Sequence, residues 1–201
     1  MKRIVLLSLF VFAVFSGCAA SKKPTATEAC DVTSYAEAEK VVDEYIQAMT
    51  HGNLQACASL MHPKALEGLQ NLLLPILEMA EEADAQATFL TLFSGVESAE
   101  ELAALSKEDF FVSFLKGSLF SQPEIFEAMK TMQVTIIGTA PEGDQVVHVL
   151  YRLKMNMLGA TIEELETISL ERSDDTWRLL LSGDIKSTAE KIKSAFAAQF
   201  Q

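Results

Sequence analysis

The chain has 201 residues, of which 16 are basic and 28 are acidic, so its formal net charge is −12. This balance argues against a nucleic-acid partner, because proteins bind the phosphate backbone through basic patches. It also argues against direct binding of the folded domain to anionic lipid headgroups.

The first predicted element is a signal peptide over residues 1–17. Met1-Lys2-Arg3 is followed by an apolar run from Ile4 to Phe15, and a basic start before a short apolar run is typical of secretory signals. The run is shorter than the ~20 apolar residues that span a bilayer. Cleavage would leave 14 basic and 28 acidic residues, a net charge of −14, because Lys2 and Arg3 are removed.

The run ends in Phe15-Ser16-Gly17-Cys18. This sequence resembles the bacterial lipobox, although Phe15 stands where leucine is usual. The resemblance implies that Cys18 is acylated, with palmitate among its chains, and anchors the protein to the membrane. Ala19 in place of aspartate implies outer-membrane sorting, facing the periplasm, if the source is Gram-negative. The alternative is an ordinary signal peptide with a cysteine near its cleavage site.

We expect residues 18–32 to form the lipidated cysteine and a flexible tether, because Ala19 to Asp31 contains no large apolar residue. Residues 33–201 then form a single α+β domain. Cys30 and Cys57 are candidates for a disulfide in an exported protein. The helix predicted between them separates them by more than the connecting residues can reach back. We therefore favour a buried, unpaired Cys57.

Two helices joined by a glycine turn open the domain. Apolar residues at helical spacing predict a helix from Ser34 to about Thr50, started by the capping box Ser34-x-x-Glu37. Gly52 ends this helix. Asn53 caps a second helix, which stops at His62-Pro63.

A further helical region extends from Lys64 to Ser121. Its leucine-rich part, from Leu66 to Leu74, is either core or a surface for lipid or a partner, and we favour core. Pro75 should break or kink it, with another helix from Pro75 to about Phe93. Later helix starts are predicted at Ser98, at Ser106 and at Pro123.

The apolar period then changes from helical to two, which predicts strands. Four are expected: 133–139, 147–157, 161–172 with a bulge near 164–166, and 177–181. Tight turns between them indicate an antiparallel meander. An amphipathic tail helix is expected from about Ile185 to Phe200.

Helices before a meander indicate an α+β fold. Three stretches resemble the nuclear-transport-factor-two-like superfamily: Ala38–Leu60 (AEKVVDEYIQAMTHGNLQACASL), Val147–Met157 and Ser169–Leu180 (SLERSDDTWRLL). The resemblance implies a curved, cystatin-like sheet wrapped around a long helix as a cone, and the helical stretch 66–129 would be an insertion. The superfamily includes isomerase-like and cyclase-like enzymes as well as domains that only bind ligands or partners.

The candidate pocket of such a cone consists of Tyr45, Tyr151, Glu166 and Trp177. Burial would raise the pKa of a carboxyl group there. The alternative is that the tyrosines are core residues and that Glu163, Glu164 and Glu166 are a solvated charge run. No metal-binding spacing, nucleophile elbow, phosphate loop or dinucleotide fingerprint occurs in the sequence, so we expect no cofactor.

The histidines have simpler interpretations. His51 and His62 lie at predicted helix ends, where a structural role is favoured. His148 shares a strand face with Arg152 and Lys154. That trio could grip an anion, but a solvated sheet face is favoured.

These observations leave three functions open. The leading hypothesis is a non-enzymatic envelope lipoprotein whose domain binds an apolar ligand or an envelope protein. The second is a small isomerase or hydrolase that uses a pocket acid. The third is a purely structural envelope protein with an apolar outer sheet face suited to pairing.

Overall fold

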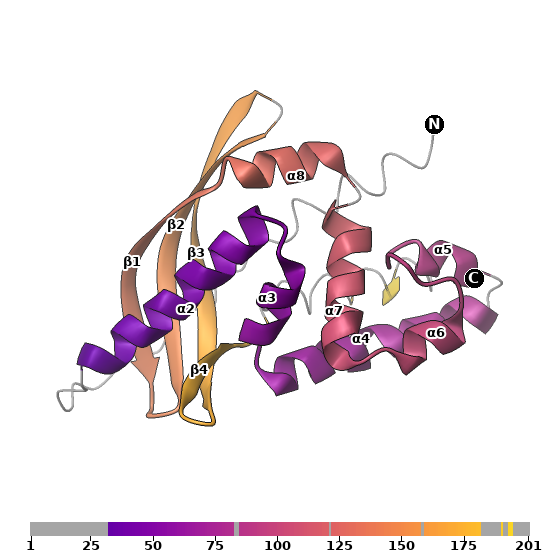
Figure 1. Ribbon diagram of the computed structural model, residues 1–201, viewed down its shortest axis with the longest axis horizontal. Coiled ribbons are helices and arrows are strands. Elements are labelled where there is room, and N and C mark those ends of the chain that lie inside the picture. Colours follow the sequence, from indigo (N-terminus) through magenta and orange to yellow (C-terminus); the bar gives the residue numbers. More distant parts are fainter. Residues whose placement is uncertain are drawn as a thin grey trace.

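The computed structural model describes residues 32–82, 85–120, 122–157 and 159–181, together with 190 and 193–194. The predicted signal peptide, Cys18, the tether, Cys30 and nearly all of the predicted tail helix lie outside these residues. Within them the fold is α+β, as predicted: helices come first and an antiparallel sheet follows (Figure 1).

The helical part runs from residue 32 to residue 130. Its elements are α2 (Val32–Thr50), α3 (Leu54–Leu60), α4 (Pro63–Glu82), α5 (Gln86–Leu90), α6 (Ala99–Ala104), α7 (Lys107–Leu115), the π-helical turn η1 (Lys116–Phe120) and α8 (Pro123–Lys130). None of the described helices is both long enough and apolar enough to cross a membrane.

The turn between α2 and α3 follows the prediction. Gly52 has a φ of +68°, which a side chain would disfavour. The Asn53 side chain accepts a hydrogen bond from the Ala56 amide at 3.3 Å. The start of α2 differs, because the helix begins at Val32 and Ser34 therefore lies inside its first turn. A capping-box sequence is compatible with helical backbone, so the helix can extend beyond it.

The predicted break at Pro75 is wrong, because α4 continues through it to Glu82. Proline removes one helical hydrogen bond. However, Leu73, Ile76 and Leu77 around it are all buried. The packing of this apolar face outweighs the lost hydrogen bond, and the favoured core interpretation of the leucine-rich segment is confirmed.

The later helix starts are capped as predicted. Ser98 Oγ accepts from the Glu101 amide at 3.1 Å, and Ser106 Oγ accepts from the Asp109 amide at 3.0 Å. Pro123 occupies the first turn of α8.

The sheet has the order β1-β2-β3-β4, and each neighbouring pair is antiparallel. Its strands are β1 (Gln133–Glu142), β2 (Val146–Met157), β3 (Ala160–Ser173) and β4 (Thr176–Leu179). The meander is therefore confirmed. The bulge predicted near Glu164 is absent, because β2 and β3 pair without interruption. The bulge lies instead in β1, where the register shifts between Ile136 and Gly138.

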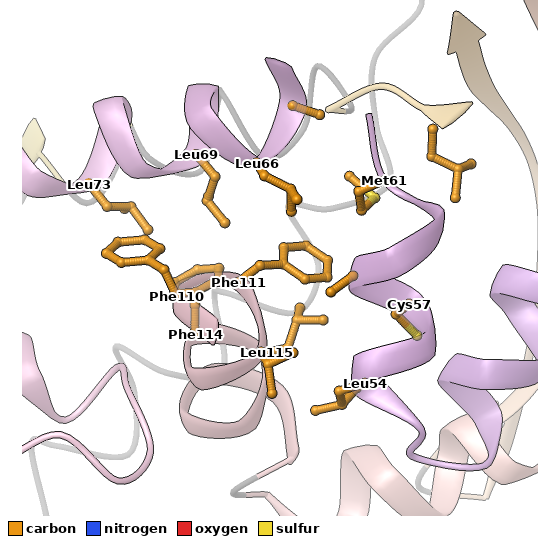
Figure 2. Packing of buried hydrophobic residues seen from close by; sticks show 14 of the residues in the cluster. Leu54, Cys57, Met61, Leu66, Leu69, Leu73, Phe110, Phe111, Phe114 and Leu115 are labelled. Atoms are coloured by element: carbon orange, nitrogen blue, oxygen red, sulfur yellow. The ribbon is translucent and has the colours of Figure 1, made fainter. Parts of the chain in front are cut away.

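The main core lies between the helices (Figure 2). Leu66, Leu69 and Leu73 of α4 meet aromatic residues of α7, and α3 closes the side with Leu54, Cys57 and Met61. The Phe93 ring packs edge-on against Phe110, with centroids 5.1 Å apart. Cys57 is a buried free cysteine, as favoured from the sequence.

Candidate functional site

The site predicted from the sequence lies on the inner face of the sheet, which α2 crosses (Figure 1). Odd-numbered residues of β2 point to this face, since Val147, Val149 and Leu153 are buried whereas Arg152 and Lys154 are exposed. The hydroxyl of Thr139 in β1 donates to Glu39 Oε1 of α2 at 2.7 Å. This hydrogen bond ties the helix to the sheet.

Two rows of side chains cross the inner face at the predicted site. Tyr151 is the register partner of Ile136 on one side and of Glu166 on the other. In the next row, Leu153 is the partner of Glu164. Directly paired residues in an antiparallel sheet share a face. Tyr151, Glu164 and Glu166 therefore all point inward, and with Tyr45 they form what we call the inner-face site.

Tyr45 reaches the site from α2. Burial raises its pKa well above the usual value, and interactions with Cys57 and Tyr151 act in the same direction. Its phenol therefore stays protonated at any physiological pH and can donate a hydrogen bond. Tyr45 lies on α2, which packs on β2, the strand that carries Tyr151.

The carboxylates differ from a solvated charge run. Glu163, on the outer face, is exposed and accepts from Arg152 at 2.7 Å. Glu164 and Glu166 are half-buried, and each has one fully covered oxygen. Glu164 Oε2 has no hydrogen-bond partner within the described part of the chain. A covered oxygen without a donor costs about 1–3 kcal/mol.

The site lies between two buried clusters. The main core reaches the sheet at Val147, Val149 and Leu170. Leu153, Met155 and Met129 are also buried but are not part of that core. They lie at the other end of the sheet, where α8 packs on β2. The polar groups of the inner-face site therefore have apolar neighbours on both sides.

Trp177 is not part of this site. It is the register partner of Arg172, whose guanidinium lies 5.2 Å from the indole centroid. Arg172 follows Glu166 by six residues on β3, which is ~20 Å along a strand. The structure therefore brings together Tyr45, Tyr151 and Glu166 but leaves Trp177 in the packing near the β3–β4 turn.

The sequence analysis missed Glu164 as a member of the site. Its signal was present, because Glu164 and Glu166 are two residues apart and must share one face of an unbroken strand. The bulge expected at this point concealed that relationship.

The histidines have structural partners. His51 Nδ1 lies 2.7 Å from the Gln47 carbonyl oxygen at the end of α2. His148 lies between Ser169 and Glu142, with distances of 2.9 and 2.8 Å to their side-chain oxygens. With Glu142 and Glu163 beside His148 and Arg152, this outer face is a mixed-charge surface, which agrees with the favoured interpretation.

His62 caps α4. Its Nδ1 accepts a hydrogen bond from the Lys64 amide at 3.0 Å, and its own amide donates to the Leu179 carbonyl at 2.8 Å. Burial lowers the pKa of this imidazole, with Glu171 opposing the shift. The ring is therefore held in the neutral state that a cap acceptor requires.

A hollow of about 270 Å³ lies in the helical region, away from the inner-face site. Its walls are formed by Gln55 of α3, the segment 94–96, Leu105 after α6, and residues of α7 and the start of η1 from Asp109 to Lys116. Because separate parts of the chain contribute, no local pattern could have predicted it. Within the described residues, no group of three or more histidine, cysteine or acidic side chains could hold a metal ion.

Comparisons with known proteins give a structural likeness. No family model and no curated protein matches the sequence. The fold is similar to the crystal structure of an NTF-2-like protein of unknown function from Shewanella oneidensis MR-1, with a TM-score of 0.42 and 13% identity. The match covers 73% of this chain and 94% of that chain.

Proposed function

We propose that the chain is a lipid-anchored envelope protein whose domain binds an apolar ligand carrying a hydrogen-bond donor. The anchor is Cys18, and Ala19 favours the periplasmic side of the outer membrane if the source is Gram-negative. The tether up to Val32 lets the domain act near the bilayer while its acidic surface keeps it off anionic headgroups.

The observation that carries the ligand proposal is the covered oxygen of Glu164. It lies opposite Leu153, and the protonated phenol of Tyr45 reaches the same face. A ligand hydroxyl or amine would supply the missing donor, and its apolar body would meet the flanking buried clusters. Such a pattern of few polar groups in an apolar surround is typical of small-molecule sites.

Native mass spectrometry of the full chain in a mild detergent tests this proposal. We expect a discrete added mass that disappears on denaturation. Glu164→Gln should reduce its occupancy at least about tenfold, because the amide has no charge and replaces one of the two acceptor oxygens with a donor. Glu163→Gln is the matched control, since that residue neighbours Glu164 but points to the outer face. A bare wild-type chain, or equal losses in both variants, would contradict the proposal.

A second candidate function is catalysis by the Tyr151–Glu166 pair, which the register brings face to face. A half-buried carboxylate beside a tyrosine can act as a general base. If the released molecule is converted when it is returned to wild-type protein, Glu166→Gln should abolish turnover and leave the circular dichroism spectrum unchanged. An unchanged rate would remove Glu166 from the mechanism.

A further inference from the structure

Methionine side chains gather at the end of the sheet where α8 packs on β2 (Figure 1). The sequence contains eight methionines, and four of them lie within residues 129–157 as two closely spaced pairs. One pair is Met129 and Met132, at the end of α8, and the other is Met155 and Met157, in β2. We call these four residues the methionine cluster. The other described methionines lie on or beside α2, α3 and α4.

The register of the sheet places Met132 beside Met155. β1 and β2 stay paired down to Gln133, the first residue of β1. Beyond it, the Asn156 amide donates to the Thr131 hydroxyl at 2.9 Å, so the two segments remain adjacent. Continuing the antiparallel register by one residue brings Met132 opposite Met155. Directly opposed residues share a face and have Cβ atoms ~4.5–5.5 Å apart.

Met129 and Met157 complete the cluster. The Met132 amide donates to the Met129 carbonyl at 3.0 Å, which folds the end of α8 into a turn. Met157 follows Met155 by two residues in β2, so it points to the same inner face. Met129 and Met155 are buried, whereas Met132 and Met157 are half-buried. The cluster therefore has two covered side chains and two that solvent reaches.

Four thioethers in one place have a chemistry that leucine side chains of similar size lack. Thioether sulfur is a soft and neutral donor, and soft donors select Cu(I) among the first-row metal ions. Each methionine side chain has three rotatable bonds. Sulfurs carried by Cβ atoms about 5 Å apart can therefore converge on one ion. Thioethers need no deprotonation before they bind a metal, which distinguishes them from cysteine and histidine ligands.

A negative charge lies near the cluster. Glu164 of β3 is diagonal to Met155 on the inner face, at ~7–8 Å. Its half-buried carboxylate would attract a cation at this distance more strongly than it would in bulk water. Lys154 points to the opposite face, and Lys130 is paired with Glu127 at 2.6 Å. The local charge therefore favours a cation at the cluster.

We infer that the methionine cluster binds Cu(I), with Met132 and Met155 as central donors and with Met129 and Met157 completing the ligand set. The half-buried members give the ion an entry path, which a metal site requires. The donors are sulfur atoms and not the tyrosines or carboxylates of the inner-face site, so this site is separate from the ligand proposal. The sequence analysis expected no metal because it considered only histidine and cysteine spacings.

The experiment is methyl NMR on the full chain in a mild detergent, with ¹³C in the methionine methyl groups. Ag(I) is the probe, because it has the charge and the soft-donor preference of Cu(I) and is stable in air. Thiols would compete for the ion, so the chain carries Cys18→Ser, Cys30→Ser and Cys57→Ala. One equivalent should shift the four methyl resonances of the cluster and leave those of the helical region in place. Zn(II), which prefers nitrogen, oxygen and thiolate ligands, should shift none.

The wild-type chain provides a second measurement that does not depend on the cysteine substitutions. It is titrated with about four equivalents of Ag(I), one for each of its three cysteines and one for the cluster. Because only methionine methyl groups are observed, filling of the thiols does not obscure the result. The same four resonances should shift.

Paired substitutions test the donors. Met155→Leu with Met157→Leu removes two thioethers and keeps the side-chain volume, so the fold should persist. The affinity for Ag(I) should fall at least about a hundredfold, since even groups that only support a metal ligand are worth about 10–100-fold. Met61→Leu with Met79→Leu is the matched control, because it also changes one buried and one half-buried methionine. The control should bind Ag(I) as the parent chain does.

Three outcomes would overturn the inference. If no methyl resonance shifts, the cluster is apolar packing only. Shifts of equal size at the helical methionines would show that binding is unspecific. An affinity that is the same in both double variants would exclude Met155 and Met157 as donors. Each of these results is independent of whether the inner-face site holds an apolar ligand.

Discussion

Tyr151 and Glu166 are direct register partners across β2 and β3, and both point to the inner face that α2 covers. The sheet thus places a phenol and a carboxylate side by side between two apolar clusters. The relationship depends on register alone, because a shift of one residue would move Glu166 to the outer face. An unbroken β2–β3 ladder is therefore a precondition of the inner-face site.

Gly117 should not tolerate a side chain. A Cβ at this position would lie 2.4 Å from the Leu92 carbonyl oxygen and 2.6 Å from the Phe93 nitrogen, both backbone atoms. We expect Gly117→Ala to lower the free energy of unfolding by about 3 kcal/mol, the upper end for overpacking. Urea unfolding measures this.

Gly68 is the matched control for Gly117. Its Cβ would meet only the Leu181 Cδ2 atom, at 4.0 Å, and it lies inside α4. Gly68→Ala should therefore raise stability by about 0.5–1 kcal/mol. Equal effects of the two substitutions would show that the close approach of η1 to the segment around Leu92 is wrong.

Pro75→Ala should stabilise the protein. The substitution restores a backbone amide in the interior of α4, where proline costs ~3 kcal/mol relative to alanine. Greater freedom of the unfolded chain offsets part of this by about 0.4–1 kcal/mol. We expect a net gain of about 2 kcal/mol in thermal or urea unfolding. Glu78→Ala, also exposed on α4, should change stability little; a loss on Pro75→Ala would mean that the helix is interrupted there.

The cap formed by His62 should make stability depend on pH. Its pKa is lowered from 6.5, chiefly by burial, so the folded state favours the neutral ring. The stability that this cap contributes is fully present above about pH 6.5 and is lost as the pH falls through the lower folded value. Protonation also places a positive charge at a helix N-terminus.

His62→Asn isolates this effect, because asparagine keeps a cap acceptor that does not titrate. As the pH falls from 7.5 to 5, the unfolding free energy of the variant should rise relative to that of wild type by up to about 1 kcal/mol. Other titrating groups are common to both proteins and cancel in that difference. A difference that is constant with pH would mean that His62 does not act as a cap.

Cys18→Ser should abolish acylation. Radiolabelled palmitate should enter the wild-type chain and not the variant, because the proposed acylation needs the Cys18 thiol. Cys57→Ser serves as the control, because its thiol is buried and burial raises its pKa to about 11. Label in the Cys18 variant would place the modification elsewhere.

The sequence predicted the elements well where local chemistry decides them. The turn at Gly52 and Asn53, the serine caps of α6 and α7 and the alternation of β2 each depend on a few adjacent residues. It failed where distant packing decides. α4 continues through Pro75 because its buried face packs against α7. The bulge lies in β1 and not in β3, because register depends on the paired strand as well as on the strand's own sequence.

The arrangement of the candidate residues shows the same limit. The register brings Tyr151 and Glu166 together on the face that is crossed by α2, the helix of Tyr45. Trp177 was grouped with them because the sequence of a strand start does not reveal where in the sheet its aromatic side chain lies. Glu164 was overlooked because it was interpreted together with the adjacent glutamates as a single charged segment. Alternation along the strand places Glu164 and Glu166 on one face and Glu163 on the other.

The contacts of α2 and α4 with the sheet also join parts of the chain that are synthesised far apart in time. Thr139 and Glu39 are 100 residues apart in sequence, and Lys64 and Glu171 are 107 apart. At a synthesis rate of ~5–20 residues per second, the strands that cover the apolar face of α2 are made about 5–20 s after the helix. The pairing of Met61 and His62 with Leu179 of β4 can form only after residue 179 has been synthesised.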